Sequence, residues 1–540
     1  MPNPSRAAAP TAEPVPTHPV VGSDDHGHPR RWLILSVLVL SLLIVVLDNT
    51  VLNVALERIS QPPPEGLSAT QAELQWAVNS YTLVFAGMLF TWGTLGDRYG
   101  RRRILVLGFV LFGLASLLSA YSADPARLVT ARAAMGLGGA AVLPSTLAII
   151  SSVFSPRERA KAIGVWAGAV GVGIAVGPIV GGTLLERFWW GSVFLINVPI
   201  VVVGLVLIAL LVPESRNPFP GRLDPPGVLL QTIGLVALVY GIIRIGDLGT
   251  ATDRTVVLPL LLGAAVLAVF VWHELRTDHP VLDVRLFRVP TFAAAVAAIG
   301  LTFFALMGVT FFMVFYLQVV RGYTPLEAGV RLLPLALGQL VSSPLSARMV
   351  SRFGARAVTT TGLGLVTTSF LGYLLLDETS SIWLLEALFF IQGAGMGNVM
   401  PPATESVMAS MPREKAGAAS AVNNTFRQVG GALGVAVLGT VLSAVYRDHV
   451  SAELSVLPLP AAAREAAATS VQATDALLDR LGPAAQALRQ PAYDAFVAAM
   501  HVTALGSAAV ALLGLVVVGR FLPGRRPAGQ PARQPGRHRR

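Results

Sequence analysis

The chain has 540 residues, of which 54% are hydrophobic and 13% are charged. Soluble globular domains carry a charged residue at about one position in four, so this composition excludes an ordinary water-soluble protein and indicates a lipid environment. The sequence contains no cysteine, which excludes disulfides, thiolate metal sites and cysteine nucleophiles. The net charge of +10 is compatible with nucleic-acid binding or with membrane topology, and the placement of the basic residues decides between them.

Apolar stretches follow one another along most of the chain, from Trp32 to Phe521. Each has roughly 18 residues or more, which is enough for a helix to cross a hydrocarbon core of about 30 Å. The sequence therefore predicts an all-α integral membrane protein with fourteen transmembrane helices. We expect these helices near residues 33–56, 74–95, 104–121, 127–150, 160–182, 192–212, 226–246, 256–273, 291–317, 326–349, 357–376, 382–408, 417–444 and 500–521.

The predicted helices fall into two groups of six with one pair between them. Residues 1–30 are rich in Pro, Ala and His without apolar periodicity, which is typical of a disordered tail. We then expect a six-helix bundle over 31–215, two inserted linker helices over 216–288 and a second six-helix bundle over 289–521. The second bundle contains an extracytoplasmic loop, 445–499, whose Ala-rich stretches favour short surface helices that act as an inert spacer or as a lid.

Basic residues gather in alternate loops between the predicted helices. Short cytoplasmic loops of membrane proteins are enriched in Lys and Arg, so this alternation indicates the orientation of the chain. It places the N-terminal tail and a basic tail over 522–540 on the cytoplasmic side of the inner membrane of the cell. Topology therefore accounts for the positive charge, and no nucleic-acid partner is expected. The basic loop residues are Arg98, Arg101, Arg102, Arg103, Arg157, Arg159, Lys161, Arg276, Arg285, Arg288, Arg348, Arg352 and Arg356.

The sequence also contains an internal repeat, with an offset of about 255 residues. An Arg-x-Gly-x-Arg motif at 98–102 recurs at 352–356, and the Gly and Pro pattern of 136–159 recurs at 393–415. Membrane proteins built from two parallel repeats hold a substrate cavity between them near the membrane midplane, and rocking of the two halves alternates its exposure. The repeat therefore predicts a transporter.

The loop between the second and third predicted helices combines a tight glycine turn with one acid and several arginines. Anchoring on the cytoplasmic side explains the arginines but neither the acid nor the glycines. We interpret the loop as a conformational latch, in which Asp97 pairs with a facing helix end or arginine in one state only. The latch residues are Gly93, Gly96, Asp97, Arg98, Gly100, Arg101 and Arg102.

The fifth predicted helix carries glycines four residues apart and one proline. Small residues at this spacing allow close helix packing in a membrane. The proline removes a backbone hydrogen bond and favours a kink. We expect this helix to pivot or to seal against a neighbour through Gly173, Gly177, Pro178, Gly181 and Gly182.

Few ionisable residues lie deep inside predicted spans, and they include Asp48 in the first helix and Arg132 in the fourth. Such residues are costly in lipid and are functional candidates by default. If the two side chains meet, protonation of Asp48 releases Arg132 and creates a proton-sensitive switch. The alternative is a static buried ion pair.

The second bundle holds candidates for a substrate cavity. Glu405 has no acidic counterpart in the repeat, which favours a transport role, whereas pairing with Arg413 or Lys415 would make it structural. Polar residues of the thirteenth helix are expected to face the cavity, because lipid does not solvate them. Aromatic residues of the ninth helix either stack on flat organic molecules or face lipid. The candidates are Glu405, Asn423, Asn424, Arg427, Phe303 and Phe304, and the other aromatic residues are Phe311, Phe312, Phe315 and Tyr316.

Motifs of enzyme chemistry are absent from the sequence. It has no phosphate-binding Walker loop and no Gly-x-Ser-x-Gly elbow. His273 and Glu274 lack the second histidine that a metalloprotease helix requires three residues after the acid. We therefore expect no enzymatic activity, no metal and no cofactor, with energy supplied by an ion gradient or by the substrate itself.

Together these segments resemble the major facilitator superfamily, and specifically its fourteen-helix drug:proton antiporter family, over nearly all of residues 32–521. The resemblance implies proton coupling at the fourth-helix motif that begins with Arg132, and antiport rather than uptake at the glycine motif of the fifth helix. Asn423 and Asn424 stand where some relatives that export dications place acids, so broad dication export is not expected. The similar segments are 47–56, 93–103, 132–139, 173–182, 194–199 and 423–431.

We therefore expect a monomeric antiporter that exports small amphipathic, often cationic, drugs or antibiotics in exchange for protons by alternating access. Asp48 and Arg132 are the expected coupling residues. The alternative within transport is an exporter of an endogenous metabolite or lipid precursor. An alternative from another class is a membrane sensor or scaffold, which would carry no proton-dependent flux.

Overall fold

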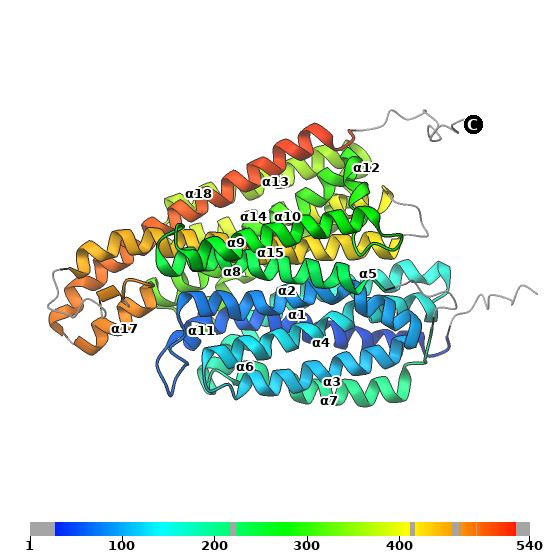
Figure 1. Ribbon diagram of the computed structural model, residues 1–540, viewed down its shortest axis with the longest axis horizontal. Helices are drawn as coiled ribbons and strands as arrows, with labels where there is room; N and C mark the ends of the chain where they lie inside the picture. The colour runs from blue at the N-terminus through cyan, green and yellow to red at the C-terminus, as the bar shows by residue number, and fades with distance from the viewer. Residues whose placement is uncertain are drawn as a thin grey trace, which may run out of the picture.

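A computed structural model describes residues 28–216, 223–410, 416–455, 464–465, 467–481 and 483–524. The described residues form helices and loops, with no β-strand among them. The long helices run side by side along the longest axis of the molecule (Figure 1). Eleven of the described helical segments are long and apolar enough to cross a membrane. The predicted all-α membrane fold is therefore confirmed, and each expected helix overlaps a helix of the structure.

The first group of helices follows the expected order. Asp124 caps α4 by accepting from Arg127 N, and a capping box of Thr70 and Glu73 starts α2. Gly100 ends α2 with a φ of +115°, a backbone angle that residues with a side chain rarely adopt. The helices are α1 (Arg31–Ser60), α2 (Gln71–Tyr99), α3 (Arg101–Ala120), α4 (Pro125–Val153), α5 (Pro156–Arg187), the short α6 (Ser192–Leu195) and α7 (Asn197–Leu211).

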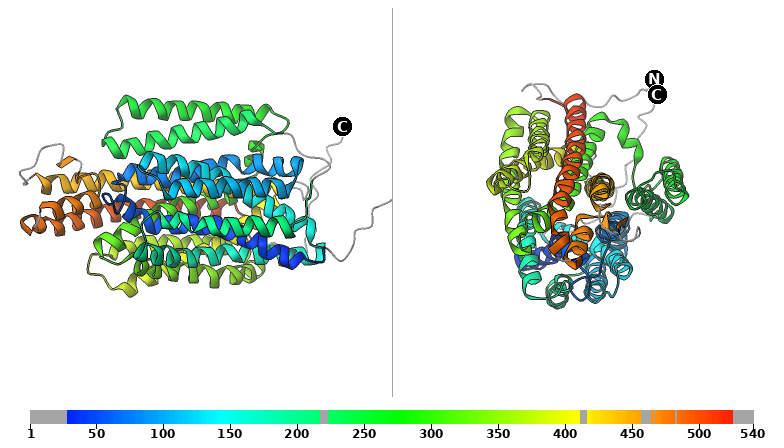
Figure 2. Two further views of the ribbon diagram at one scale, coloured as in Figure 1. Left: turned by 90° about the horizontal axis from the view of Figure 1, so that it is seen from below. Right: turned by 90° about the vertical axis from the view of Figure 1, so that its left-hand side faces the viewer.

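The two inserted helices, α8 (Pro225–Leu248) and α9 (Arg254–Arg276), form a hairpin on the outside of the molecule (Figure 2). α8 packs against both α2 and α15 (Ala416–Leu454), while most of α9 is exposed. The 3-10 turn η1 (Val284–Arg288) then leads into the second group of helices. The hairpin therefore touches one helix from each group.

The second group contains more breaks than expected. Pro334 lies in the first turn of α12, where the helix expected near 326–349 divides in two. α15 and α18 extend well beyond the apolar stretches, so the expected loop 445–499 is largely helical in its described part. The elements are α10 (Pro290–Phe315), η2 (Tyr316–Val320), α11 (Pro325–Arg331), α12 (Leu333–Phe353), α13 (Ala355–Gly372), η3 (Tyr373–Leu375), α14 (Ile382–Ala409), α17 (Val471–Leu481), η5 (Pro483–Leu488) and α18 (Arg489–Phe521).

The two groups repeat the same pattern of helix packing. α2 packs on α4, α3 on α4 and α1 on α5, and these pairs correspond to α12 on α14, α13 on α14 and α10 on α15. The repeated loop motif also has the same backbone, because Gly354 has a φ of +86° where Gly100 has +115°. The sequence repeat thus corresponds to a repeat of structure.

Contacts between the two groups gather at the end of the molecule that holds α17, which we call the α17 end. There α5 packs on α11, and Gln318 donates a hydrogen bond to the Val54 carbonyl (3.0 Å). A Cβ atom at Gly439 of α15 would lie 2.8 Å from the Gln75 side chain of α2. The start of α1 and the end of α18 lie at the opposite end (Figure 1).

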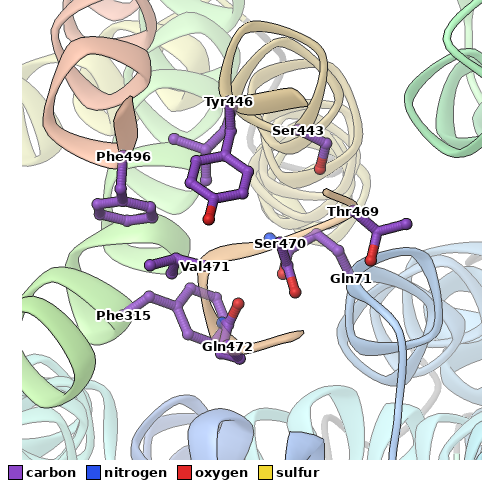
Figure 3. A pocket seen from close by; sticks show the side chains of 10 residues that line it. Gln71, Phe315, Ser443, Tyr446, Thr469, Ser470, Val471, Gln472 and Phe496 are labelled. Atoms are coloured by element: carbon purple, nitrogen blue, oxygen red, sulfur yellow. The ribbon is translucent and has the colours of Figure 1, made fainter. Parts of the chain in front are cut away.

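The segment before α17 closes a small pocket at this end (Figure 3). Val471 is buried there, and the Tyr446 hydroxyl donates to Thr474 Oγ1 (2.7 Å). Arg489 also pairs with Asp475 of α17 (2.9 Å). The lining comes from α2, α10, α15, α18 and the α17 segment, with Gln71, Phe315, Leu442, Ser443, Tyr446, Thr469, Ser470, Val471, Gln472 and Phe496.

Glycine contacts set how closely α3 and α4 approach, and one substitution tests this. A Cβ atom at Gly138 would lie 2.5 Å from the backbone N of Phe112, whereas one at Gly364 would lie 3.8 Å from Leu515. We predict that Gly138→Ala costs about 1–3 kcal/mol of stability because the helices must separate. Gly364→Ala, the matched control, should leave the melting temperature in detergent nearly unchanged. Equal melting temperatures for both variants would contradict this packing.

Candidate functional site

Asp48 of α1 and Arg132 of α4 meet inside the first group of helices. Arg132 Nη1 lies 2.5 Å from Asp48 Oδ2, and the two side chains are 0% and 1% exposed. Two opposite charges at this distance, with no route to water, form a charge-assisted hydrogen bond. The structure thus brings Asp48 and Arg132 together.

Contacts from two further helices fix the guanidinium of Arg132. Its Nε donates to the carbonyl of Ala77 on α2 (3.1 Å), and its Cζ lies 4.4 Å from the ring centre of Tyr81. The ring of Phe194 on α6 lies 5.8 Å away. Arg132 Nη2 is buried without a hydrogen-bond partner. The cation is therefore held by α1, α2 and α6 and keeps one unused donor nitrogen.

Asn197, at the start of α7, is a member of this site to which the sequence gives no role. Its Nδ2 donates to Asp48 Oδ1 (3.0 Å) and to Ser116 Oγ (3.0 Å). The Ser116 hydroxyl in turn donates to the Phe194 carbonyl (2.8 Å). Each oxygen of the Asp48 carboxylate therefore has one donor. The sequence does carry one signal for Asn197. Its side-chain amide stands alone in an apolar span, where lipid offers no hydrogen-bond partner, so a partner within the protein is expected.

This arrangement has two electrostatic states. With Asp48 ionised, the guanidinium and the amide satisfy its carboxylate; with Asp48 protonated, the attraction to Arg132 is lost and the cation remains buried without a counter-charge. An uncompensated buried charge is strongly unfavourable, so protonation favours a rearrangement of α1 and α4. In this conformation the Asp48 carboxylate is 1% exposed.

The glycine helix α5 lies against the same part of α1. Cβ atoms at Gly173 and Gly177 would lie 2.8 Å from Val46 and 1.8 Å from Thr50, which flank Asp48 along the chain. A Cβ atom at Gly181 would lie 3.0 Å from Val51, one turn further on. α5 and the helix that carries Asp48 therefore touch without intervening side chains.

The far end of α5 reaches the second group of helices. A Cβ atom at Gly182 would lie 2.4 Å from Leu326 Cα, and one at Gly329 would lie 2.4 Å from the carbonyl of Pro178. Both contacts join α5 to α11. α5 therefore links the helix that carries Asp48 to the interface between the two groups.

The loop expected to act as a latch is held within the first group. Asp97 Oδ1 accepts from Arg101 Nη2 (2.8 Å), four residues along the chain, and Arg101 Nη1 donates to the Ala148 carbonyl of α4 (3.1 Å). The backbone N of Arg102 donates to Glu214 (3.1 Å), which follows α7. Gly93 and Gly96 lie near Pro144 and Ser145 of α4, Gly100 lies against Glu214, and Arg98 is exposed. Glu214 is a second contact that the sequence did not single out.

The expected cavity residues separate into exposed, half-buried and buried groups. Glu405 is exposed near the end of α14, and its expected partners Arg413 and Lys415 lie outside the described residues. Asn423, Asn424, Phe303 and Phe304 are half-buried, and Arg427 Cζ lies 5.2 Å from the Phe303 ring centre. The remaining aromatic residues of this helix are buried in the core and do not face lipid: Phe311, Phe312, Phe315 and Tyr316.

The described residues contain no group of three His, Asp or Glu side chains placed to hold a metal ion. His273 does not take part in such a group, because its Nε2 bonds to Asp224 Oδ1 (2.8 Å) at the start of α8. Glu274 accepts instead from the backbone N of Leu282 (2.9 Å). These two residues fasten the end of the inserted hairpin.

Comparison with known proteins gives one family and several similar transporters. Residues 38–435 match the Major Facilitator Superfamily. The chain is 36% identical to the multidrug efflux pump LfrA of Mycolicibacterium smegmatis, and the match covers 91% of this chain and 96% of that protein. It is 37% identical to the methyl viologen resistance protein SmvA of Salmonella typhimurium, over 90% of this chain and 97% of that one. It is 33% identical to the tetracenomycin C resistance and export protein of Streptomyces glaucescens, and this match covers 90% of this chain and 91% of that protein.

A solved structure shares the fold. The inward-facing, occupied structure of a bacterial homologue of the human lysosomal transporter Spinster matches with a TM-score of 0.67 at 19% identity. The match covers 92% of this chain and 98% of that one.

The Asp48–Arg132 pair predicts a specific pattern of stability. Arg132→Met leaves the buried carboxylate without its cation, and we expect a loss of about 3–5 kcal/mol, measured by unfolding in mixed micelles. Adding Asp48→Asn should recover a large part of this loss, because the uncompensated charge is then removed. The control is Arg127→Met on the same helix, whose side chain is 72% exposed in a surface pair that contributes at most about 1 kcal/mol. Additive losses in the double variant would argue against the pair.

Proposed function

The chain belongs to the major facilitator superfamily, and from that premise we propose that it exports small amphipathic drugs in exchange for protons. Its relatives are named as a multidrug efflux pump, a methyl viologen resistance protein and an antibiotic exporter, and each matches at least 90% of this chain. Their names support an organic substrate and the direction of transport. The observation that carries the proton coupling is the buried Asp48–Arg132 pair.

We assign the transport unit to a bundle over 31–215 and a bundle over 289–521 of one monomer in the inner membrane. Residues 216–288 insert a hairpin beside them. The start of α1 and the end of α18 share one end of the molecule, where the basic loops are expected (Figure 1). This arrangement supports cytoplasmic termini. The α17 end then faces the outside.

With this orientation, the described conformation is closed to the outside. The bundles meet at the α17 end through α5 with α11 and through Gln318 with Val54. The main hydrophobic cluster joins both bundles around residues 305–317, which span the end of α10 and the start of η2. Nearer the cytoplasm, Phe292 to Ile299 of α10 belong to a separate cluster, whose buried members all come from the second bundle. The asymmetry supports a path that opens toward the cytoplasm, where a drug would enter.

Coupling follows from the contacts of α1 and α5. Protonation of Asp48 removes its attraction to Arg132, so α1 is free to shift relative to α4. The Gly173 and Gly177 contacts transmit a shift of α1 to α5, and the Gly182 contact ties α5 to the outer closure. Because Asp48 is 1% exposed in the closed state, protons do not leak across without a change of state. The protonation state of Asp48 and the state of the outer closure are thereby linked.

A second candidate function is export of a compound that the cell makes itself. The relatives named for tetracenomycin C and actinorhodin occur in Streptomyces species. The same mechanism serves both functions, so two measurements on a deletion strain separate them. Loss of growth on a panel of drugs favours drug export, whereas retention of one of the cell's own metabolites favours export of that compound.

We predict that Asp48→Asn abolishes uphill drug transport, because the amide cannot take up and release a proton. The measurement is dye efflux in inverted membrane vesicles with and without a proton gradient. Asp253→Asn is the matched control, since Thr255 hydrogen bonds lower the pKa of this exposed carboxyl and keep it charged. The control should transport like the wild type.

Two outcomes of this experiment would contradict the proposal. Gradient-driven transport by a folded Asp48→Asn variant would remove Asp48 from the coupling. The absence of gradient-dependent flux of any dye or antibiotic from the wild type would favour a sensor or scaffold.

A disulfide tests the outer closure, and the absence of native cysteines makes the test clean. We expect Gln75→Cys with Gly439→Cys to cross-link under oxidation, because a Cβ atom at Gly439 would lie 2.8 Å from the Gln75 side-chain amide across the α2–α15 interface. The bond should stop transport, and a reductant should restore it. Each single variant serves as a control. Full transport by the oxidised double variant, with the bond verified by mass spectrometry, would show that this interface need not open.

A further inference from the structure

Arg427 is a second arginine within the helical core, and it lacks the partners that Arg132 has. Its Nε atom is buried without a hydrogen-bond partner. It forms no ion pair with any carboxylate of the described chain, and its Cζ lies 5.2 Å from the centre of the Phe303 ring. The residue as a whole is half-buried.

The surroundings of Arg427 place it between helices and not against lipid. Gly430 and Gly434, one and two turns further along α15, would bring a Cβ atom to 2.3 Å and 2.0 Å from carbonyl oxygens of α10. Phe303 packs against both main hydrophobic clusters, one of which joins the two bundles. The face of α15 that carries Arg427 therefore turns toward the interior.

A second unpaired polar group lies one helical turn from this guanidinium. Asn423 Oδ1 is buried without a hydrogen-bond partner, four residues before Arg427. Residues four apart lie on the same face of a helix. The repeat offset matches Arg427 with Gly171 or Val170, so the pseudo-symmetry does not require a cation here.

An unpaired arginine is energetically unfavourable in the interior of a membrane protein. At Arg132 a carboxylate offsets this cost. At Arg427 no described carboxylate does so, which leaves water or a ligand to supply acceptor oxygens. A site that holds one fixed cation without a counter-charge repels dications and attracts acceptors.

We propose that Arg427, Asn423 and Phe303 bind the acidic edge of planar aromatic substrates. The guanidinium donates to a carboxylate, sulfonate or phenolate oxygen of the substrate, whose ring stacks beside Phe303. Asn423 Oδ1 accepts from a substrate hydroxyl. This assignment rests on the proposed export function and narrows its substrate class from amphipathic drugs in general to acidic aromatic ones.

The test compares two dyes that share a xanthene core and differ in charge, the anionic sulforhodamine B and the cationic rhodamine 6G. Binding to purified protein is measured by fluorescence polarisation, and flux is measured in inverted vesicles. We expect Arg427→Gln to weaken sulforhodamine B binding by about 10–100-fold, the loss of one charge-assisted contact, and to leave rhodamine 6G unchanged or tighter. Arg480→Gln, which removes an exposed arginine of α17, is the control and should alter neither.

The ratio of the two dye affinities, measured on one preparation, decides the outcome, because partial misfolding lowers the measured binding of both dyes together. If Arg427→Gln fails to fold, Arg427→Lys keeps the charge and should reduce the ratio by a smaller factor. An unchanged ratio in a variant that still transports would overturn this assignment while leaving the export function intact. Absence of proton-driven flux of both dyes and of an antibiotic panel from the wild type would instead refute the export function.

Discussion

A single ion pair in the interior of the first bundle constrains much of the surrounding structure. Two opposite charges withdrawn from water are tolerated only when each is paired and hydrogen-bonded. Asp48 meets this condition with one donor on each oxygen, from Arg132 and from Asn197. These donors come from α4 and α7, so α1 is tied to both helices through one carboxylate. Removing the negative charge of that carboxylate weakens both ties at once.

Helix α5 connects the part of α1 around Asp48 to the other bundle. Its glycines remove the side-chain layer between α5 and α1 beside Asp48, and its end beyond Pro178 does the same against α11 of the other bundle. Packed helices without intervening side chains have little freedom to absorb a shift, so displacement at one contact is felt at the other. The inserted hairpin stands outside this route, since it packs on α2 and α15 at the edge of the molecule.

The extent to which sequence predicted the structure depends on the kind of signal. Hydropathy located the helices because burial in lipid demands long apolar runs, but it reports membrane thickness and not helix length. It therefore ended α15 near 444, whereas the helix continues to Leu454. The repeat was visible because Gly100 and Gly354 both adopt a backbone that favours glycine. Asp48 and Arg132 stood out because charges are rare within spans.

Uncharged or locally paired groups gave weaker signals. Asn197 carries no charge, and nothing in its spacing indicates that it reaches Asp48 on a helix 149 residues away. Asp97 is expected to pair with a facing helix end or arginine in one state only, and in this structure it pairs with Arg101, which lies one turn away on the chain. The aromatic residues of α10 were ambiguous because lipid and protein core favour the same side chains, and only the packing of helices places Phe311 and Phe315 in the core.

Proton release on drug binding tests the central claim most directly. Purified protein in weakly buffered detergent is mixed with a transported drug, and a pH indicator dye reports the change in pH of the solution. If Asp48 is the group that exchanges protons for drug, the wild type releases protons on drug addition and Asp48→Asn releases none, while both bind the drug. Equal proton release from the two proteins would contradict the assignment.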